Sequence, residues 1–361
     1  MIKIGYNDSS QHVGFLTHVE IPNRTNYCVS ELKKYYGEGL FIQNSTKDSI
    51  KHNDAMKLLT CHSGKHILSL INFVSNKFYC RFCKQPMTSG HVSGDSAGKI
   101  SFNDFINNSS MCKFCKKTRS LQDIFSYADS DTYITPFTFD VVLDGVKVLK
   151  CLIDEISNHH KNIRCGFALV RPPGHHCNND PSGFCVVNNA VVSSKYAQEK
   201  GYNKVLILDI DFHHGNGTSN LIKSRNETNI YMCSIHGFGF GIYPGTGSEK
   251  ENTDNIYNIP LKVGLDSASR GYITDDYYLN IIENNVNNFI KRTNPNMIII
   301  SCGFDGHQDD PLEGFNLTDD AYVRIAQYLK SLNIPLLFIT EGGYSVNAIS
   351  RSVCKMVQVF L

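Results

Sequence analysis

The chain has 361 residues, of which 41% are hydrophobic and 19% charged, and its formal net charge at pH 7 is +1. These values are those of an ordinary globular protein, and the charge excludes a chain-wide attraction to nucleic acid or to an acidic membrane. No apolar run could span a bilayer and no signal-peptide pattern is present, so the 13 cysteines are expected to be reduced thiols or metal ligands in the cytoplasm or nucleus.

The first 75 residues predict a short strand over residues 1–6 and helices over residues 27–36 and 54–74. Residues 18–24 are expected to form a loop that ends in Arg24. A charged residue in such a loop can be a solvated surface group or a buried functional cation, and both readings stay open.

Two copies of the pattern Cys-basic-Phe-Cys-Lys follow, at residues 80–84 and 112–116. Four thiolates are the tetrahedral set that a structural zinc prefers. The polar segment between the copies could not build a core of its own, and a bound zinc would supply the missing stability. We therefore predict a small zinc-ribbon-like insertion at residues 76–126, with Cys80, Cys83, Cys112 and Cys115 as ligands. The alternative is two unrelated cysteine pairs, because their separation exceeds the usual ribbon spacing.

Strands and helices alternate through the rest of the chain. The predicted elements are a helix over 141–156, a strand over 165–170, a helix that runs to 196, strands over 204–208 and 230–234, a helix over 273–292, a strand over 297–302, a helix over 318–332 and a strand over 335–340. This alternation predicts a mostly parallel sheet with helices on both faces.

Polar residues follow four of these strands. They are His175 and His176, then Asp209, Asp211 and His213, then Asp305, and finally Tyr344. Ligands of open α/β sheets bind outside the carboxyl ends of the strands, so these residues are expected to share one crevice.

Asp209, Asp211 and His213 alternate, and strand geometry would direct all three to one side. Buried carboxylates are costly unless a cation lies among them. We predict a divalent metal held by Asp211, His213 and Asp305, with zinc as the default and ferrous iron as the alternative. A charged loop without metal is the competing interpretation.

The two histidines could act as general base and acid beside that metal. Asp209 and Asn216 would orient the two imidazoles, and Tyr344 could donate its hydroxyl to a developing oxyanion. Considered alone, Tyr344 would be an ordinary half-buried tyrosine.

Six ordered motifs resemble those of the zinc-dependent histone deacetylase family. They are Arg-Pro-Pro-Gly-His-His at 171–176, Gly-Phe-Cys at 183–185, Leu-Asp-Ile-Asp-Phe-His-His-Gly-Asn-Gly-Thr at 208–218, Tyr-Pro-Gly-Thr-Gly at 243–247, Gly-Phe-Asp at 303–305 and Glu-Gly-Gly-Tyr at 341–344. The resemblance spans the chain apart from the cysteine insertion, and His-His-Gly-Asn-Gly-Thr with Asp-Asp-Pro-Leu at 309–312 is similar to the class II branch. It implies the three-layer arginase/deacetylase fold, one catalytic domain over 1–361, and hydrolysis of the acetyl amide of N6-acetyl-lysine in proteins with release of acetate.

The resemblance also implies roles for single residues. Asp211, His213 and Asp305 match the zinc ligands, His176 the general base and acid, His175 its cationic partner bonded to Asp209, and Tyr344 the hydroxyl that stabilises the oxyanion after attack by a zinc-activated water. Gly183, Phe184 and Tyr243 match the lysine tunnel, Asp131 the rim aspartate, and Arg24 a cation on the acetate channel. An inner potassium site would involve Asp209, Asp211, His213, Ser234 and Ile235.

Some positions depart from the family pattern. Tyr243 stands where a second tunnel phenylalanine is usual, and Asn216 replaces the aspartate of class I, which should leave His176 less cationic. Leu312 stands where a polyamine-specific relative carries an acid, which favours acetyl-lysine as substrate. The insertion precedes the rim segment, so we expect it to influence the choice of substrate or partner.

Two other functions remain open. One is an acetyl-lysine-binding scaffold or corepressor with little turnover, and the other is a deacetylase of acetylpolyamines or other small acetyl amides. Expected partners are an acetylated protein or peptide and corepressor or chromatin proteins, with neither nucleic acid nor membrane.

Overall fold

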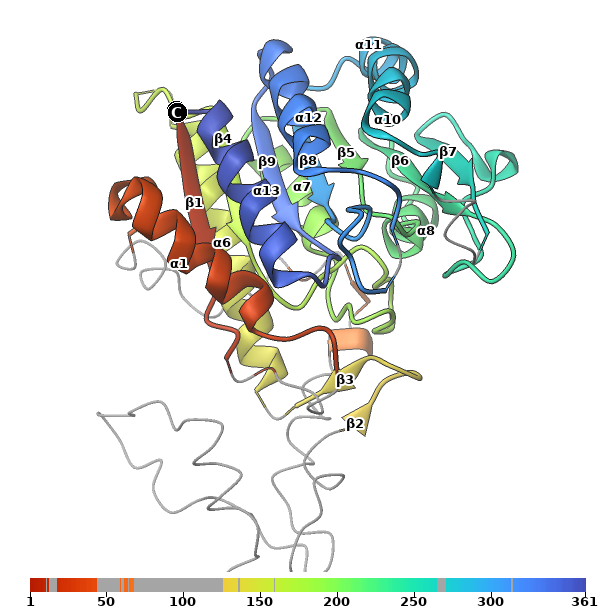
Figure 1. Cartoon of the computed structure of the whole chain (residues 1–361), viewed down its shortest axis with the longest axis horizontal. Helices are drawn as coiled ribbons and strands as arrows, with labels where there is room; N and C mark the ends of the chain where they lie inside the picture. Colours follow the sequence, from red (N-terminus) through yellow and green to blue (C-terminus); the bar gives the residue numbers. More distant parts are fainter. Residues whose placement is uncertain are drawn as a thin grey trace, which may run out of the picture.

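The computed structural model describes residues 1–10, 12, 18–43, 59, 62, 63, 65–67, 126–135, 137–158, 160–264, 271–312 and 314–361. Its centre is a seven-stranded sheet in the order β1-β4-β9-β8-β5-β6-β7, in which all neighbouring strands are parallel (Figure 1). The strands are β1 (Ile2–Tyr6), β4 (Cys165–Leu169), β5 (Val205–Asp209), β6 (Ile230–Phe238), β7 (Ile256–Lys262), β8 (Met297–Cys302) and β9 (Leu336–Thr340). The predicted fold, a mostly parallel sheet between helices, is confirmed.

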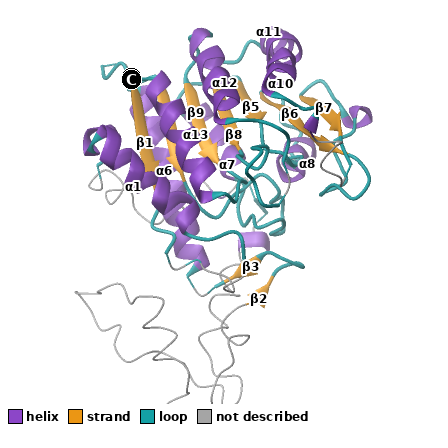
Figure 2. Cartoon of the chain, in the orientation of Figure 1, coloured by secondary structure: helices purple, strands orange, loops and turns teal. Residues whose placement is uncertain are grey.

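The strand side chains divide between two hydrophobic cores, one on each face of the sheet. In β5, Leu206 and Leu208 enter one core whereas Val205 and Ile207 enter the other, as the two-residue repeat of a strand requires. The first core is covered by α1 (Asn23–Tyr36), α10 (Asp275–Ile281), α11 (Asn287–Thr293), α12 (Asp319–Ser331) and α13 (Val346–Val359). The second is covered by α6 (Thr138–Ser157), α7 (Asn189–Glu199) and α8 (Asn216–Ser224), so the molecule has three layers (Figure 2).

Several shorter elements complete the described chain. A π-helical turn, η5 (Ile282–Val286), joins α10 to α11, and short 3-10 turns occupy η1 (Glu38–Leu40) and η4 (Glu249–Glu251). The strands β2 (Ser126–Tyr127) and β3 (Tyr133–Ile134) form a separate antiparallel pair. Within the described ranges, no helix combines the length and apolar character that crossing a membrane requires.

The structure corrects one prediction at the start of the chain. Arg24 lies in the first turn of α1 and not in a loop, because the helix begins at Asn23 directly after Pro22, whose backbone already has helical angles. β7 was not predicted because it contains Pro260, which a strand tolerates at the edge of a sheet. The cysteine insertion and most of the helix expected over residues 54–74 lie outside the described residues.

Two buried histidines that are not among the predicted catalytic residues predict how acid affects stability. Burial lowers the pKa of both His12 and His62 to about 3, whereas an unfolded histidine titrates near 6.5. The unfolded chain therefore binds these protons first, and the free energy of unfolding should fall by about 1.4 kcal/mol per pH unit for each histidine as the pH drops from 6.5.

Urea unfolding at pH 7, 6 and 5 measures this slope. His12→Asn is expected to flatten it by about one histidine's share, whereas the matched change at exposed His160 should leave it unchanged. An unaltered slope in His12→Asn would contradict the assignment.

Candidate active site

Three predicted metal ligands meet at the carboxyl ends of β5 and β8. The Nδ1 atom of His213 lies 2.9 Å from Asp305 Oδ2 and 3.3 Å from Asp211 Oδ1. Both carboxylates are fully buried, and one potential ligand atom from each of the three residues lies within 4.8 Å of the others. An acid–acid–imidazole set of this kind can hold a divalent metal and leave coordination positions open.

Backbone donors hold the remaining carboxylate oxygens in place. Gly342 N donates to Asp211 Oδ2 over 2.8 Å, and Phe212 N donates to Asp305 Oδ1 over 2.8 Å. Burial disfavours a protonated His213, but its hydrogen bonds to the two carboxylates outweigh burial and raise its pKa to about 10. A protonated His213 would compensate part of the buried negative charge, and a bound metal cation would take the place of its proton.

Asp211, His213 and Asp305 lie together as expected, but strand alternation is not the reason. β5 ends at Asp209, so Asp211 and His213 lie in the loop beyond the strand and do not follow its alternation. Asp211 N donates to Asp209 Oδ1 over 3.1 Å and His213 N donates to Asp211 Oδ1 over 2.9 Å. Successive carboxylates thus cap the backbone two residues later and turn the loop toward Asp305.

The tandem histidines each contact the predicted partner. His175 Nδ1 lies 3.1 Å from Asp209 Oδ2, and His176 Nδ1 lies 2.8 Å from Asn216 Oδ1. Burial opposes charge on His175, but the Asp211 and Asp209 carboxylates raise its pKa well above the usual range. Burial and the neighbouring His175 hold the pKa of His176 well below its usual range. One imidazole is therefore cationic while its neighbour, whose Nδ1–H donates to the amide oxygen, keeps an Nε2 lone pair.

Tyr344 lies against a buried cation. The guanidinium of Arg24 is 4.8 Å from the centre of the Tyr344 ring, and Arg24 donates to the carbonyl oxygens of Gly343 and Glu341. Tyr344 N donates to Asp310 Oδ2 over 2.6 Å. Burial raises the pKa of Tyr344 well above its usual value although Arg24 opposes the shift, so the phenol keeps its proton.

Aromatic side chains pack against His176 and Tyr344. The Tyr243 ring meets His176 edge to face with centroids 4.9 Å apart, and Phe184 meets Tyr344 in the same way at 5.8 Å. Gly183 has φ +52°, and a Cβ there would lie 2.6 Å from His176 Cδ2 and 2.8 Å from the Tyr243 hydroxyl. Only glycine can occupy this approach, which brings the backbone onto the ring of His176.

The rim is acidic beside the β2–β3 pair. Asp129 accepts from Gly183 N over 3.2 Å, and Thr132 Oγ1 accepts from Phe184 N over 2.9 Å, so this segment holds the backbone of Gly183 and Phe184. Asp131 is half-buried, and burial with the nearby Asp129 raises its pKa to about 6. Leu312 is 43% exposed.

Sequence reasoning gave no role to three buried residues that join the site. Glu20 accepts hydrogen bonds from Arg171 and Arg24, and Glu341 Oε2 accepts from Gly174 N over 2.6 Å and His175 N over 3.2 Å. Arg171 and Glu341 lie inside two of the quoted motifs, which was the available signal. Nothing in the sequence alone identified Glu20.

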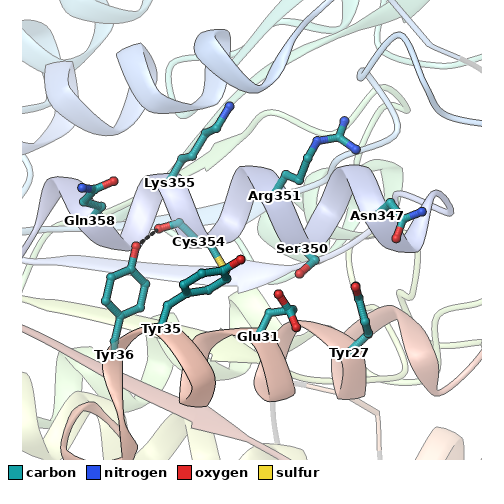
Figure 3. A pocket seen from close by; sticks show the side chains of 10 residues that line it. All are labelled: Tyr27, Glu31, Tyr35, Tyr36, Asn347, Ser350, Arg351, Cys354, Lys355 and Gln358. Carbon is teal, nitrogen blue, oxygen red and sulfur yellow. Dashed lines mark hydrogen bonds between the residues drawn. The ribbon is translucent and has the colours of Figure 1, made fainter.

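Two further features do not belong to this site. His62, His66 and Cys177 form a buried cluster, but His62 bonds to Asn178 O and Asn188 N and His66 to Val186 O, so these rings brace the chain after His176. A hollow of about 650 Å³ lies between α1 and α13 (Figure 3). Its cations, Arg351 and Lys355, pair with acids outside it.

Gly303 provides a test of how tightly the predicted metal ligands are packed. A Cβ at this position would lie 2.0 Å from Asp211 Oδ2, which cannot retreat because Gly342 N holds it. Gly303→Ala is expected to lower the free energy of unfolding by about 1–3 kcal/mol and to reduce bound metal. Urea unfolding and metal analysis measure both, with Gly39→Ala as control because a Cβ there meets nothing within 4 Å. Unchanged metal content in Gly303→Ala would contradict this packing argument.

Comparisons with known proteins find similar sequences. A family profile described as the histone deacetylase domain matches residues 18–360. An uncharacterized protein of Synechocystis sp. is 34% identical over 237 residues, which cover 64% of this chain and 73% of that protein. Histone deacetylase 15 of Arabidopsis thaliana is 35% identical (66% of this chain, 43% of that protein), and acetylpolyamine amidohydrolase 1 of Pseudomonas aeruginosa is 31% identical (64% of each). The chain thus spans less than two thirds of the length of these last two relatives.

Solved structures show the same fold. The crystal structure of the HDA15 HD domain superposes with a TM-score of 0.75 at 26% identity, covering 99% of this chain and 90% of that one. An acetylpolyamine aminohydrolase from Burkholderia pseudomallei superposes with a TM-score of 0.71 at 18% identity, which supports the fold alone.

Proposed function

Because the chain belongs to the histone deacetylase family, we propose that it hydrolyses the acetyl amide of N6-acetyl-lysine in proteins or peptides and releases acetate. The observation that carries this proposal is the arrangement of three groups around one crevice. A metal-ligand set, Asp211, His213 and Asp305, is flanked by the tandem histidines and by the Arg24–Tyr344 pair.

The histidines divide the proton chemistry between them. His176 keeps a lone pair on Nε2 because its Nδ1–H donates to Asn216, so it can take a proton from the attacking water and later deliver it to the departing lysine amine. His175 stays cationic beside Asp209 and stabilises negative charge. Tyr344, a protonated phenol, donates to the oxyanion.

We propose zinc as the metal, and the donor set fits it. One oxygen of each carboxylate faces His213 Nδ1, while backbone N–H groups hold the other oxygens. When bound, zinc would polarise the acetyl carbonyl and make the attacking water more acidic. A structural zinc on Cys80, Cys83, Cys112 and Cys115 remains a proposal from the sequence.

An inner potassium ion is proposed on the grounds of charge and register. Asp209 and Ser234 are partners across β5 and β6, and both are fully buried. The other groups of this proposed site are Asp211, His213 and Ile235. An increase in deacetylase activity when K⁺ is added at constant ionic strength would support this potassium site.

The tunnel supports a slender acyl-lysine chain as substrate. The Tyr243 ring packs against His176 and the Phe184 ring against Tyr344, and aromatic rings of this kind suit the lysine methylenes. Leu312 places an apolar side chain where an acid would favour a polyamine, and Asp131 at the rim could accept from the peptide backbone. The Asp129–Asp131 pair would also attract a polyamine cation, so acetylpolyamine hydrolysis is the second candidate.

The test compares kcat/KM for an acetyl-lysine peptide with that for N-acetylputrescine and N8-acetylspermidine, with and without a chelator. A chelator-sensitive preference for the peptide is expected, and a preference for the polyamines would replace the substrate assignment. Binding of an acetyl-lysine peptide without turnover would favour the scaffold function.

We propose that the protein acts in the cytoplasm or the nucleus on acetylated protein, with corepressor or chromatin partners. The insertion at 76–126 is proposed to influence substrate choice, since the chain that follows it forms the rim. Deleting it should alter the ranking of acetyl-lysine peptides, and an unchanged ranking would exclude that role.

A further inference from the structure

Two catalytic loops must be held in register for the proposed reaction. The histidine loop, residues 171–176, follows β4, and the tyrosine loop, residues 341–344, follows the neighbouring strand β9. His176 and Tyr344 act on the same substrate carbonyl from these two loops. A shift of about 1 Å between reacting groups can cost two orders of magnitude in rate.

Glu20 connects the loops through two arginines. Its carboxylate accepts from Arg171, the first residue of the histidine loop, with Nη2 at 2.5 Å from Oε2, and from Arg24 Nη1 at 3.0 Å from Oε1. Arg24 in turn donates to two carbonyl oxygens of the tyrosine loop, those of Glu341 and Gly343. Glu20 has no exposed surface, Arg171 is 1% exposed and Arg24 is 3% exposed.

Glu341 makes a second connection in the opposite direction. It belongs to the tyrosine loop, and its Oε2 accepts from the Gly174 and His175 amides of the histidine loop. Ser301 donates to Oε1 over 3.0 Å and fixes the side chain from β8. The two glutamates therefore join the same pair of loops at separate points.

We propose that Glu20 and Glu341 are positioning residues that hold Tyr344 in register with His176. This inference rests on the proposed function, in which His176 and Tyr344 act on the same substrate carbonyl. Neither glutamate is assigned a contact with the substrate. Without the Glu20 charge, Arg24 and Arg171 are two buried cations that repel each other, and Arg24 is the group that fixes both the backbone and the ring of Tyr344.

The packing of α1 beside α13 agrees with the positioning role proposed for the glutamates. Figure 3 shows that the two helices lie side by side, and Tyr36 donates to Cys354 O over 3.1 Å. Arg24 lies in the first turn of α1 and Tyr344 lies just before α13. The helix pair thus supports the contact between Arg24 and Tyr344 on one side, and Glu20 supports it through its hydrogen bond to Arg24.

A double-mutant cycle tests the role of Glu20. Glu20→Gln is expected to lower kcat on the acetyl-lysine peptide at least about tenfold with KM little changed, but less than threefold in a Tyr344→Phe background. Glu38→Gln, an exposed change near the end of α1, should have no effect. Equal losses in both backgrounds would overturn the proposal. If Glu20→Gln does not fold, Arg24→Lys replaces it, because lysine keeps the charge but cannot bind both carbonyls.

Hydrogen exchange provides a readout that does not depend on activity. Glu341→Ala should speed exchange of the Gly174 and His175 amides, and Glu341→Gln, which keeps an acceptor oxygen, should restore protection. Glu20→Gln should speed exchange of the Gly342 and Tyr344 amides, to which Glu20 makes no bond. Unchanged exchange of the Gly342 and Tyr344 amides in Glu20→Gln would overturn this proposal, whether or not the chain hydrolyses acetyl amides. A lack of hydrolysis would by itself refute only the proposed function.

Discussion

Replacing Tyr344 by phenylalanine is expected to lower kcat on an acetyl-lysine peptide by about two to three orders of magnitude. The change removes the hydroxyl that is proposed to donate a hydrogen bond to the developing oxyanion. Tyr344 is suited to that role because burial keeps its phenol protonated and Arg24 holds its ring. Steady-state kinetics on the purified protein measure the loss.

The binding controls separate this effect from a disturbed site. Bound metal and the affinity for a hydroxamate should stay within a few-fold of the unaltered chain, since the phenylalanine ring preserves the contacts with Phe184 and Arg24. Tyr243→Phe is the matched control, because it also removes a tyrosine hydroxyl, but one that bonds to Ser182 and not to the reacting atoms. A Tyr344→Phe chain with more than a tenth of the original kcat would exclude the oxyanion role.

Replacing Asp211 by asparagine is expected to reduce metal affinity by at least about 100-fold and to remove hydrolysis. Loss of a direct ligand should cost at least as much as loss of the groups that merely orient ligands, which is about 10- to 100-fold. Asparagine has almost the same shape and can still accept from Gly342 N, so the fold should persist. Metal titration followed by peptide hydrolysis measures both effects.

Treatment of the unaltered chain with a chelator should reproduce the asparagine phenotype reversibly. Activity should return when zinc is added to the unaltered chain but not to the Asp211→Asn chain. Asp276→Asn, an exposed carboxylate whose partner is Arg324, serves as the charge-matched control. Full hydrolysis in the presence of chelator would show that the reaction does not depend on this metal.

The parts of the site that sequence reasoning found are those that follow a strand. β5, β8 and β9 are continuous apolar runs, and the polar residues after them stand out because parallel strands end at one edge. That argument located Asp211, Asp305 and Tyr344. The cause of the convergence could not be read, because the chain leaves β5 at Asp209 and the later turn depends on backbone bonds to the carboxylates.

Glu20 shows why the rest could not be predicted. Its partners, Arg24 and Arg171, are separated from each other by almost 150 positions, and only the packed fold brings them to one carboxylate. Glu20 and Arg24 are only four positions apart, but nothing in the sequence records the contact with Arg171, which lies 151 positions after Glu20. β7 escaped detection for a different reason, since its single proline is acceptable only because the strand lies at the edge of the sheet.

The pairing of β1 with β4 has a consequence for chain entropy. Ile2 lies opposite Cys165, so closing the sheet joins ends that are separated by roughly 160 residues, within which the cysteine insertion lies. Because the entropic cost of closing a loop grows only with the logarithm of its length, about 50 inserted residues add only about 0.3 kcal/mol. This connection can therefore lengthen or shorten at almost no cost to the sheet, and the segment before the rim is free to change in evolution while the strand ends stay fixed.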